Sequence, residues 1–405
     1  MTIEVDGRTA LALPRLRYAR TTTGPLRGVR VLDLTRLVSG AQLGVVLGDL
    51  GADVIKVERP GSGDPFRHAG GSDAHWRAYA RNKRSITLDL ACPRGRELLL
   101  ELAARADVLV ENFAPGVLER LVGGPKALLE RNPKLVVVRI SGWGQTGPRS
   151  SNPGFGTLAE AFAGFTFLNG PPGGPPHPAP LSLADTVAGT YAALAALAAL
   201  WEVRANGGDG QVVDVSLFEP LFSIMGADAT AYAMSGRRRR RGDTPGISSV
   251  RGVFETADGH WVALSAATDE TALRFFTALG RLDLLDDPRF ATAAARHDNR
   301  DALGEVLAEE FAARTRDEVL RLAEEHRLTI GPVYDILDII EDEHYRARKT
   351  VVEMEDGTVL TNVVPRLSRT PGAIRTPAPA LGEHNAEVYG ELGLDLEELE
   401  REGVI

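Results

Sequence analysis

A single carboxylate stands at the start of a long apolar stretch of this chain. Residues 180–200 read PLSLADTVAGTYAALAALAAL, and Asp185 is the only charged side chain among them. An aspartate at the N-cap of a helix accepts hydrogen bonds from the first free amides, and the helix dipole favours its ionised form. A carboxylate held in this way can attack an electrophile. The alternative is a capping aspartate with no chemical role.

The other residue types that carry chemistry do not form a recognisable site. None of the eight histidines pairs with another histidine or with Cys92 at the spacing of metal ligands, and Glu341 with His344 reads as a solvated helix face. The sequence has no Gly-x-Ser-x-Gly elbow and no Gly-Lys-Ser phosphate loop. His384 is predicted to cap or bridge within a loop. Asp185 is therefore the one candidate with a mechanism, and no metal is expected.

The charge balance and the single cysteine limit the class of protein. The 405 residues carry 55 acidic and 46 basic side chains, a net charge of -9, whereas dedicated nucleic-acid binders have an excess of basic charge. The arginine run at 237–241 reads as a solvated linker, with an anion or partner contact as the alternative. One cysteine excludes an internal disulfide and fits a cytoplasmic protein. No segment reaches the ~20 consecutive apolar residues of a membrane helix, so neither a membrane nor a nucleic acid is expected as a partner.

Strand-like and helix-like segments alternate through the first third of the chain. Residues 30–35, 40–50 and 53–59 read as strand, helix and strand, and 85–90, 107–111 and 134–141 read as further strands. This alternation predicts an open, doubly wound, mostly parallel α/β sheet of Rossmann type. Its ligand crevice would lie where the strands end, at residues 35–39, Arg59, 112–113 and 141–144. The turn at 38–44 lacks the glycine fingerprint for pyrophosphate, so no nicotinamide is expected.

The remaining segments predict a second domain and a long loop. Residues 1–23 read as an N-terminal extension, 24–220 and 350–405 as the large α/β domain, 221–250 as a linker, and 251–349 as a smaller α+β domain. A length of 405 residues is enough for two cores. The glycine-rich and proline-rich residues 146–180 predict a long active-site loop that leads to Asp185. Residues 363–367, VVPRL, are strand-like.

Seven segments resemble one family in sequence and in order. They are RVLDLTRLVSGAQLGVVLGDLGADVIKVERPGSGDPFR (30–67), NKRSITLDL (82–90), ADVLVENFAPGVLERL (106–121), ISGWGQTGP (140–148), DTVAGTYAALAALAALWE (185–202), GQVVDVSLFE (210–219) and APALGEHNAEVYGELGL (378–394). They are similar to the family III CoA-transferases, the family that contains formyl-CoA transferase, carnitine CoA-transferase and α-methylacyl-CoA racemase. The resemblance covers residues 24–405.

The resemblance implies a reaction and a set of contacts. It implies transfer of CoA from an acyl-CoA donor to a carboxylic acid, through an aspartyl anhydride and an aspartyl-CoA thioester on Asp185. It implies that CoA, the co-substrate, lies across the carboxyl edge of the sheet and that the protein forms an interlocked homodimer. Position by position, it implies CoA contacts at Leu37, Val38, Ser39, Arg59, Leu88, Asn112, Phe113 and Arg120. The two arginines suit phosphate because a guanidinium is permanently charged and forked.

Two departures from the family pattern bear on the reaction. Ala91 and Ser141 stand where some transferases carry lysines on the CoA path, so other basic residues would take over those contacts. Phe155 and Gly156 stand where racemases carry a His-Asp pair. Racemisation needs an acid and a base on opposite faces of the α-carbon, and these two residues supply neither. The sequence favours a transferase, with a racemase that recruits another base and an inactive CoA-binding protein as alternatives.

Overall fold

The chain divides into two compact units, each with its own hydrophobic core. The computed structural model describes residues 3–5, 8–10, 12–21, 23–242, 250–266 and 268–405. The first unit comprises Met1–Arg241 with His344–Ile405, and the second Gly242–Glu343. These limits differ from the predicted boundaries at 220, 250 and 349. The predicted linker at 221–250 contains the end of α9 (Phe218–Ile224) and all of α10 (Asp228–Ser235), both helices of the first unit.

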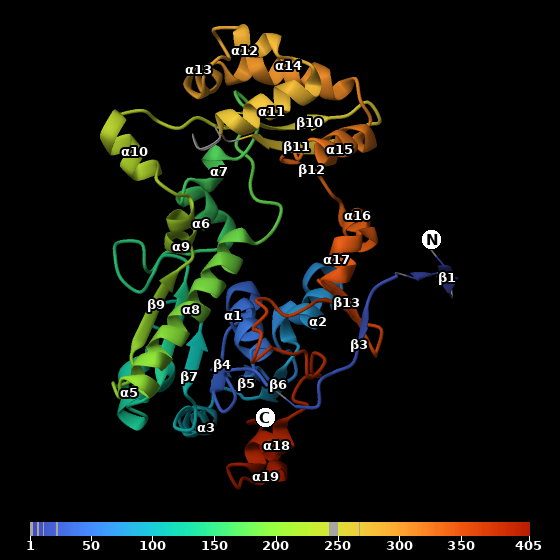
Figure 1. The fold of residues 1–405 in the computed structure, drawn as a ribbon. Coiled ribbons are helices and arrows are strands. Elements are labelled where there is room, and N and C mark those ends of the chain that lie inside the picture. Colours follow the sequence, from blue (N-terminus) through green and yellow to red (C-terminus); the bar gives the residue numbers. More distant parts are fainter. Residues whose placement is uncertain (1–2, 6–7, 11, 22, 243–249, 267) are drawn as a thin grey trace. The chain divides into compact units, whose positions relative to one another are not determined.

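The first unit is built on a six-stranded parallel sheet (Figure 1). Its strands lie in the order β6-β5-β4-β7-β8-β9, and every neighbouring pair is parallel. They are β4 (Arg30–Asp33), β5 (Asp53–Glu58), β6 (Lys83–Thr87), β7 (Val108–Glu111), β8 (Val136–Ser141) and β9 (Val212–Ser216). In this doubly wound order the direction of winding reverses between β4 and β7, where such sheets bind ligands. The predicted parallel α/β sheet is confirmed.

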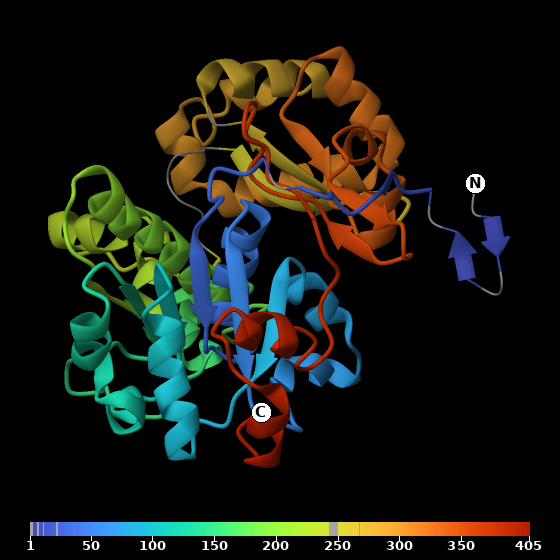
Figure 2. The same cartoon turned by 90° about the horizontal axis from the view of Figure 1, so that it is seen from below.

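Helices cover both faces of this sheet and separate two cores. On one face, α1 (Leu37–Asp49) and α8 (Leu183–Ala205) pack against Val136, Val138 and Ile140. On the other face, Val137 packs among α3 (Pro93–Ala103), α5 (Gly124–Arg131), α18 (Asn385–Gly390) and α19 (Leu396–Arg401). Successive strand residues alternate between the cores because the strand is pleated. Figure 2 shows the C-terminal helices, in red, beside the blue strands, and Tyr389 donates a hydrogen bond of 2.7 Å to the Thr87 carbonyl there.

The predicted loop at 146–180 contains two helices, so that prediction was wrong in part. They are α6 (Gly156–Phe162) and α7 (Phe165–Leu168). Residues 157–162, TLAEAF, include strong helix formers, and the loop composition that predicted irregular structure is concentrated in 169–180. The other short elements of the first unit are the 3-10 helix η1 (Pro65–Gly71), α2 (Ala74–Ala80) and α4 (Val117–Val122).

Part of the predicted N-terminal extension belongs to the first unit. Strand β3 (Arg15–Leu16) pairs in parallel with β13 (Val351–Met354), which pairs antiparallel with β14 (Val359–Thr361). Leu13, just before β3, is buried. In this part of the chain the strand lies at 359–361 and not at the predicted VVPRL, 363–367. Residues 363–367 are irregular backbone, because their proline lacks the N–H that a strand ladder requires. Further out, β1 (Ile3–Val5) and β2 (Arg8–Ala10) form an antiparallel pair.

Helix α8 carries a face of small residues against α1 and the sheet. Ala184, Ala188, Ala192, Ala196 and Ala199 are buried. By length and composition alone this 23-residue helix could cross a membrane, but the same composition is expected of a core helix whose close neighbours leave no room for large side chains. Here its alanine face packs on α1 and the sheet.

Replacing Gly189 with alanine is expected to destabilise the first unit by about 1–3 kcal/mol, the usual cost of overpacking. Helix α8 crosses α1 at this glycine, and a Cβ there would overlap the Ser39 carbonyl oxygen and lie 2.8 Å from Gln42 Cβ. Chemical denaturation of the full chain measures the change. Gly304→Ala is the control, because a Cβ at Gly304 meets no atom within 4 Å. Equal stability of both variants would contradict this account of the helix crossing.

The second unit combines a small sheet with a layer of helices. Its antiparallel strands are β10 (Val250–Glu255), β11 (Trp261–Ala266) and β12 (Ile330–Pro332). Phe254, Phe275 and Phe311 stack in its core. The helices are α11 (Asp269–Leu279), α12 (Asp283–Asp286), α13 (Ala293–Asp298), α14 (Arg300–Ala312), α15 (Arg316–Glu325) and α16 (Ile336–Glu341), and α17 (Glu343–Ala347) leads into the first unit.

Candidate functional site

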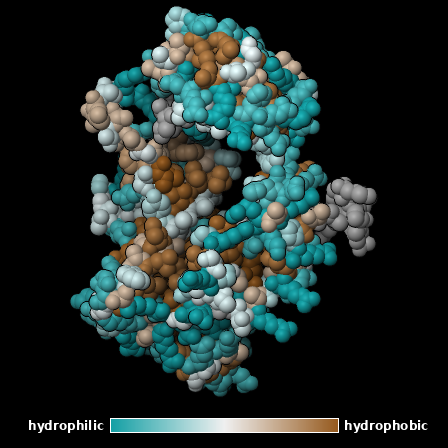
Figure 3. Space-filling model, viewed as in Figure 1, coloured by the Kyte–Doolittle hydropathy of each residue, from teal (hydrophilic) through white to brown (hydrophobic). Residues whose placement is uncertain are grey.

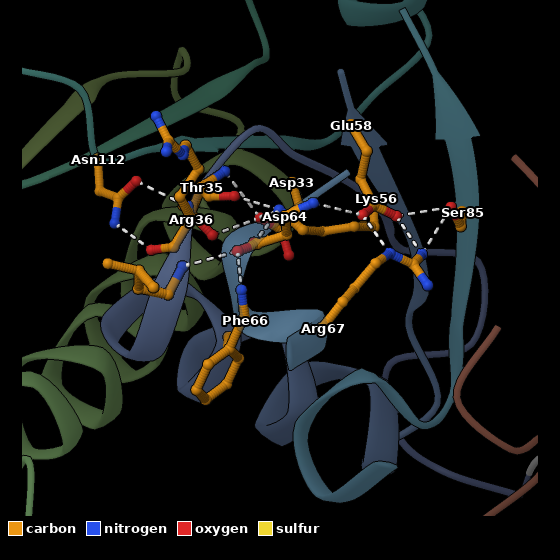
Figure 4. Close-up of polar contacts among 12 residues, drawn as sticks. Asp33, Thr35, Arg36, Lys56, Glu58, Asp64, Phe66, Arg67, Ser85 and Asn112 are labelled. Carbon is orange, nitrogen blue, oxygen red and sulfur yellow. Dashed lines mark hydrogen bonds and ion pairs between the residues drawn. The ribbon is translucent and has the colours of Figure 1, made fainter. Parts of the chain in front are cut away.

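Helix α1 begins at the carboxyl edge of the sheet, where the winding reverses between β4 and β7. Asn112, directly after β7, binds the backbone of Arg36, accepting from its N–H at 2.9 Å and donating to its carbonyl at 2.7 Å. The same amide group lies 3.5 Å from the Ser39 hydroxyl. Figure 4 shows the two hydrogen bonds between Asn112 and the Arg36 backbone. Asn112 thus anchors the start of α1 to β7.

A buried group of charges supports the same helix start from the side of β5 (Figure 4). Lys56 Nζ lies 3.6 Å from Asp33 and 3.3 Å from Asp64, and it donates to the Thr35 carbonyl. Lys83 Nζ lies 3.2 Å from the other oxygen of Asp33. All four charged side chains are almost completely buried. Because an unpaired charge is costly to bury, this arrangement holds the residues between β4 and α1 in one place.

The pKa values of this group follow from its pairing. Burial alone would raise the pKa of Asp33, but Lys56 and Lys83, with the Thr35 hydrogen bonds, lower it below its usual value. Burial would lower the pKa of Lys56, yet Asp33, Asp64 and Glu58 raise it. Burial does lower the pKa of Lys83, against the attraction of Asp33. Lys56 and Asp33 are therefore a charged pair at neutral pH.

A cavity of about 650 Å³ lies at the carboxyl ends of β4, β5 and β6. Its wall includes three of the predicted contact residues, Arg59, Leu88 and Phe113, together with Arg36, Lys56 and Ala91. Arg36 and Arg59 are exposed, and within the described part of the chain neither has an acidic partner. A guanidinium in this state can bind phosphate in a forked manner.

The other predicted contact residues lie around this cavity rather than in its wall. Leu37, Val38 and Ser39 form the first turn of α1 next to Arg36. Asn112 is occupied with the backbone of Arg36, and Arg120 is an exposed side chain of α4 whose neighbour Leu121 reaches the cavity. Arg36 and Lys56 were not named from the sequence. Arg36 lies within the predicted edge at 35–39, whereas no sequence signal marks Lys56, since it lies inside a strand.

Asp185 lies in the first turn of α8 and is not its N-cap, so that prediction was wrong. The helix begins at Leu183 after Ser182, whose side chain makes no capping hydrogen bond. Instead of Asp185, the buried Glu160 of α6 accepts a hydrogen bond of 3.3 Å from the Ala184 amide. The carboxylate of Asp185 is thus free of a capping role.

The environment of Asp185 opposes its ionisation. Burial, the larger cause, and repulsion from Glu160 together raise the pKa of Asp185 from 3.8 to about 6. The helix dipole was expected to keep this carboxylate ionised, and the structure corrects that expectation, because burial beside a second carboxylate outweighs the dipole. A side chain with such a shift is a candidate for chemistry.

The loop at 142–154, whose two ends lie close together, places Gly156 in contact with the Asp185 carboxylate. The backbones of Gly142 and Gly154 lie so close that a Cβ on Gly142 would be 2.7 Å from the Gly154 Cα. Trp143 Nε1 donates to the Pro153 carbonyl at 3.0 Å and closes the loop between them. Two residues later, a Cβ on Gly156 would overlap Asp185 Oδ2 and lie 3.3 Å from its Cγ. The carboxylate therefore occupies space that only glycine leaves open.

The start of α1 lies between Asp185 and the cavity. Gly189, one turn after Asp185, touches the Ser39 carbonyl, while the Leu37 amide donates to Asp64 in the cavity wall at 3.2 Å. A molecule that extended from the cavity across the first turn of α1 would reach Asp185. The structure brings the predicted nucleophile and the predicted contact residues to one edge of the sheet.

If Asp185 is the nucleophile that the family resemblance implies, the activity is expected to rise with pH with a midpoint near 6, the pKa of its carboxyl group. Below that pH the carboxyl is protonated, so kcat/KM for the acyl-CoA falls about tenfold per pH unit. Glu160→Gln removes the repulsion and should move the midpoint to lower pH. Any titration of the substrate itself affects the unmodified protein and Glu160→Gln equally. Coincident pH profiles of the two proteins would therefore contradict the claim that Glu160 raises the pKa of Asp185.

The arginine run at 237–241 was predicted to be a solvated linker, and that prediction was wrong in part. Arg239 pairs with Asp228 at 3.0 Å. Arg241 donates to the Phe167 carbonyl at 3.0 Å and to the Gly174 carbonyl. Arg241 thus binds the segment after α10 to residues 167–174, because a guanidinium can serve several carbonyl oxygens at once, whereas Arg239 binds the same segment back to α10.

Comparison with known proteins gives one consistent result. The model of CoA-transferase family III matches residues 26–385. The succinyl-CoA–D-citramalate CoA-transferase of Chloroflexus aurantiacus is 38% identical over 91% of this chain and 94% of its own length. The succinate–glutarate CoA-transferase of Agrobacterium fabrum is 34% identical over 91% of this chain and 96% of its own length.

Solved structures agree with the sequence matches. A CaiB/BaiF family protein from Brucella suis superimposes with a TM-score of 0.81 at 32% identity, over 91% of this chain and 99% of that one. Rv3272 from Mycobacterium tuberculosis superimposes with a TM-score of 0.80 at 31% identity, over 90% of this chain and 99% of that one. The family resemblance of the seven sequence segments is confirmed. The chain is an enzyme that belongs to CoA-transferase family III.

Proposed function

We propose that this chain transfers CoA from an acyl-CoA donor to a carboxylic acid, with Asp185 as the nucleophile. The observation that carries the proposal is the position of the Asp185 carboxylate, which fills the space over Gly156 next to the first turn of α1. A pKa of about 6 leaves this carboxylate mostly ionised at neutral pH. Poor solvation by water makes an ionised carboxylate more reactive as a nucleophile.

The reaction that this carboxylate supports has four steps. An Asp185 oxygen attacks the thioester carbonyl, the C–S bond breaks, and CoA leaves as a thiolate. The thiolate attacks the Asp185 carbonyl of the mixed anhydride and releases the donor acid, which leaves an aspartyl-CoA thioester. The acceptor carboxylate then displaces the thiolate to form a second anhydride. The thiolate attacks the acceptor's carbonyl, which forms the new acyl-CoA and frees Asp185.

We infer further that the donor is a dicarboxylic acyl-CoA such as succinyl-CoA. The names of the two relatives above support this, since both act on succinate or its CoA thioester. Position 156 supports transfer over racemisation. An acid or base at that position would need the space that the Asp185 carboxylate fills, and Phe155 beside it exchanges no proton.

We also propose how CoA lies on the enzyme. Its phosphates would bind Arg36 and Arg59 in the cavity, and its chain would pass Leu88 and Phe113. The backbone of Leu37, Val38 and Ser39 and the side chain of Arg120 complete the contacts we assign to it. Because the Leu37 amide donates to Asp64, the amides that would face CoA are those of Val38 and Ser39. The free amides of a first helical turn suit the negative charge that develops on a thioester oxygen. The exposed guanidinium of Arg36 would replace the lysines that are absent at Ala91 and Ser141.

We propose that two copies of the chain associate. Figure 3 shows apolar surface over the part of the first unit that contains α6 and α8. Exposed side chains there include Phe155, Leu158, Leu194 and Trp201, the last of them 69% exposed. A face of this kind marks an association surface. Light scattering is expected to give twice the mass of one chain. Two relatives are named as alpha and beta subunits. The mass of a single chain would therefore indicate that the partner is a different protein.

Intact-mass analysis tests the proposed reaction directly. The protein is mixed with succinyl-CoA and a panel of other acyl-CoAs, then treated with hydroxylamine. A CoA adduct or hydroxamate at Asp185 is expected, and the thioester that traps best identifies the donor. Exchange of the α-proton in heavy water without any adduct would instead support the racemase. CoA binding without adduct or exchange would support the inactive binding protein.

A further inference from the structure

The first residue of α1 has an unusual backbone conformation for its type. Leu37 has a φ of 62°, in the left-handed region that a residue with a Cβ disfavours. Its side chain is 37% exposed, so burial of that side chain does not offset the steric cost of the left-handed backbone. A conformation of this kind persists only where the surroundings impose it, and such positions cluster at functional sites.

One buried carboxylate holds Leu37 directly. Asp64 is 4% exposed, and its Oδ1 accepts from the Leu37 amide at 3.2 Å and from the Phe66 amide at 2.9 Å. Its Oδ2 lies 3.3 Å from Lys56 Nζ. Because both oxygens are occupied, the carboxylate cannot rotate away from Leu37.

Asp64 is in turn fixed to the rest of the sheet. Its own amide donates to Glu58 Oε2 at 2.9 Å. Glu58 binds both Arg67, at 2.6 and 2.8 Å, and the Ser85 hydroxyl, at 2.6 Å. Figure 4 shows this chain of contacts from Ser85 to the start of α1. The strands β5 and β6 thereby determine where Asp64 lies.

We propose that Asp64 is a positioning residue for the transfer reaction, which fixes Leu37 in the left-handed conformation and so presents the first-turn amides of α1 to bound acyl-CoA. This inference rests on the proposed function. The side chain of the N-cap residue Arg36 makes no capping hydrogen bond. Asp64 binds the Leu37 amide, and the amides of Val38 and Ser39 point out of the helix end. Without Asp64, Leu37 would relax toward negative φ and turn these amides away from the cavity.

The test is a double-mutant cycle with Asp64→Ala, Leu37→Gly and the pair together. Glycine adopts positive φ without a steric penalty, so Asp64 should matter less when residue 37 is glycine. Asp64→Ala is expected to raise the Kd for CoA and the KM for succinyl-CoA by about tenfold, the scale of a hydrogen bond to a charged group. In the glycine background the same change should raise both by no more than about threefold.

Several outcomes overturn the inference. An unchanged Kd in Asp64→Ala, or the same fold-change in both backgrounds, would show that Asp64 does not act through Leu37. If Asp64→Ala does not fold, Asp64→Asn replaces it, because asparagine keeps an acceptor for the Leu37 amide. The Kd of Asp64→Asn for CoA is expected to lie within about threefold of that of the unmodified protein. A tenfold higher Kd in Asp64→Asn would also contradict the inference. Asp73→Ala, which changes an exposed aspartate nearby, is the control. Failure of the unmodified protein to bind CoA would instead refute the proposed function.

Discussion

Asp185→Asn is expected to lower kcat for CoA transfer by at least about a thousandfold, since removal of a nucleophile leaves only binding and orientation. The amide is nearly the same size as the carboxylate, so the contact with Gly156 and the start of α8 are preserved. The Kd for CoA should remain within about twofold, because the cavity does not include residue 185. No hydroxylamine-trapped adduct should form.

The same substitution should make the protein more stable at neutral pH. The pKa of Asp185 is about 6 in the folded state against an ordinary 3.8. A raised carboxyl pKa means that the folded state binds more protons, so ionisation destabilises it progressively from pH 4 to 6 and fully above. Asparagine removes this effect, which amounts to up to about 3 kcal/mol at pH 8 and vanishes near pH 4.

The combination of lost activity and gained stability distinguishes a functional carboxylate from a structural one. Asp209→Asn, at an exposed aspartate paired with Lys134, is the control and should alter neither property. If Asp185→Asn retains substantial turnover, the assignment of the nucleophile is wrong. If activity is lost together with stability, Asp185 supports the fold and the loss says nothing about chemistry.

Gly156→Ala is expected to lower kcat by about a hundredfold or more, while the free energy of unfolding changes by less than about 1 kcal/mol. A Cβ at this position would overlap Asp185 Oδ2. The end of a side chain can move aside at little cost to the fold, but the carboxylate then leaves the orientation from which it attacks. Misplacement of a reacting atom by about 1 Å can cost a hundredfold in rate.

The measurements that test this are steady-state kinetics with succinyl-CoA and chemical denaturation of the same sample. Gly304→Ala, at a glycine with no neighbouring atom, controls for the added methyl group and should leave kcat unchanged. Normal turnover in Gly156→Ala would sink the idea that glycine is needed for the position of the carboxylate. A loss of both stability and rate would place Gly156 in the packing of α6 on α8 instead.

The two variants and the pH profile examine one arrangement from different sides. Asp185 supplies the attacking oxygen in the proposed reaction, Gly156 leaves space for its carboxylate, and Glu160 raises its pKa. These three residues come from α6 and α8, two helices that the sequence did not place together. The contact of these three residues distinguishes the proposed transferase site from an ordinary helix N-terminus.

Much of the large unit was predictable from local sequence. The strand residues of β4, β5, β7 and β8 form short apolar runs between turn signals, and their alternation with helices determines a parallel sheet. The edge at which ligands bind follows from that sheet, because parallel strands end together. The predicted sheet therefore indicated where Arg59 and Phe113 would gather, the family resemblance added Leu88, and the local sequence indicated that a helix would begin near Asp185.

Other predictions failed where a local signal competed with a nearby one. Ser182 precedes Asp185 and takes the N-cap position. Helices α6 and α7 lie inside a segment whose overall composition is that of a loop. Strand β3 forms only because β13, more than 300 residues later, offers it a partner. Arg241, in the run at 237–241, donates to the carbonyl of Phe167, which is 74 residues away in the sequence.

Tertiary structure alone decided the electrostatics of the site. Burial and the approach of Glu160, 25 residues before Asp185, set the pKa of the proposed nucleophile, and no local pattern encodes either. The left-handed Leu37 depends on Asp64, and Asp64 depends on Lys56 and Glu58 from β5. Residue types and their spacing determine which elements form, because propensity and hydrophobic periodicity are local. Distances between side chains, and hence charge states and orientations, exist only after those elements have packed.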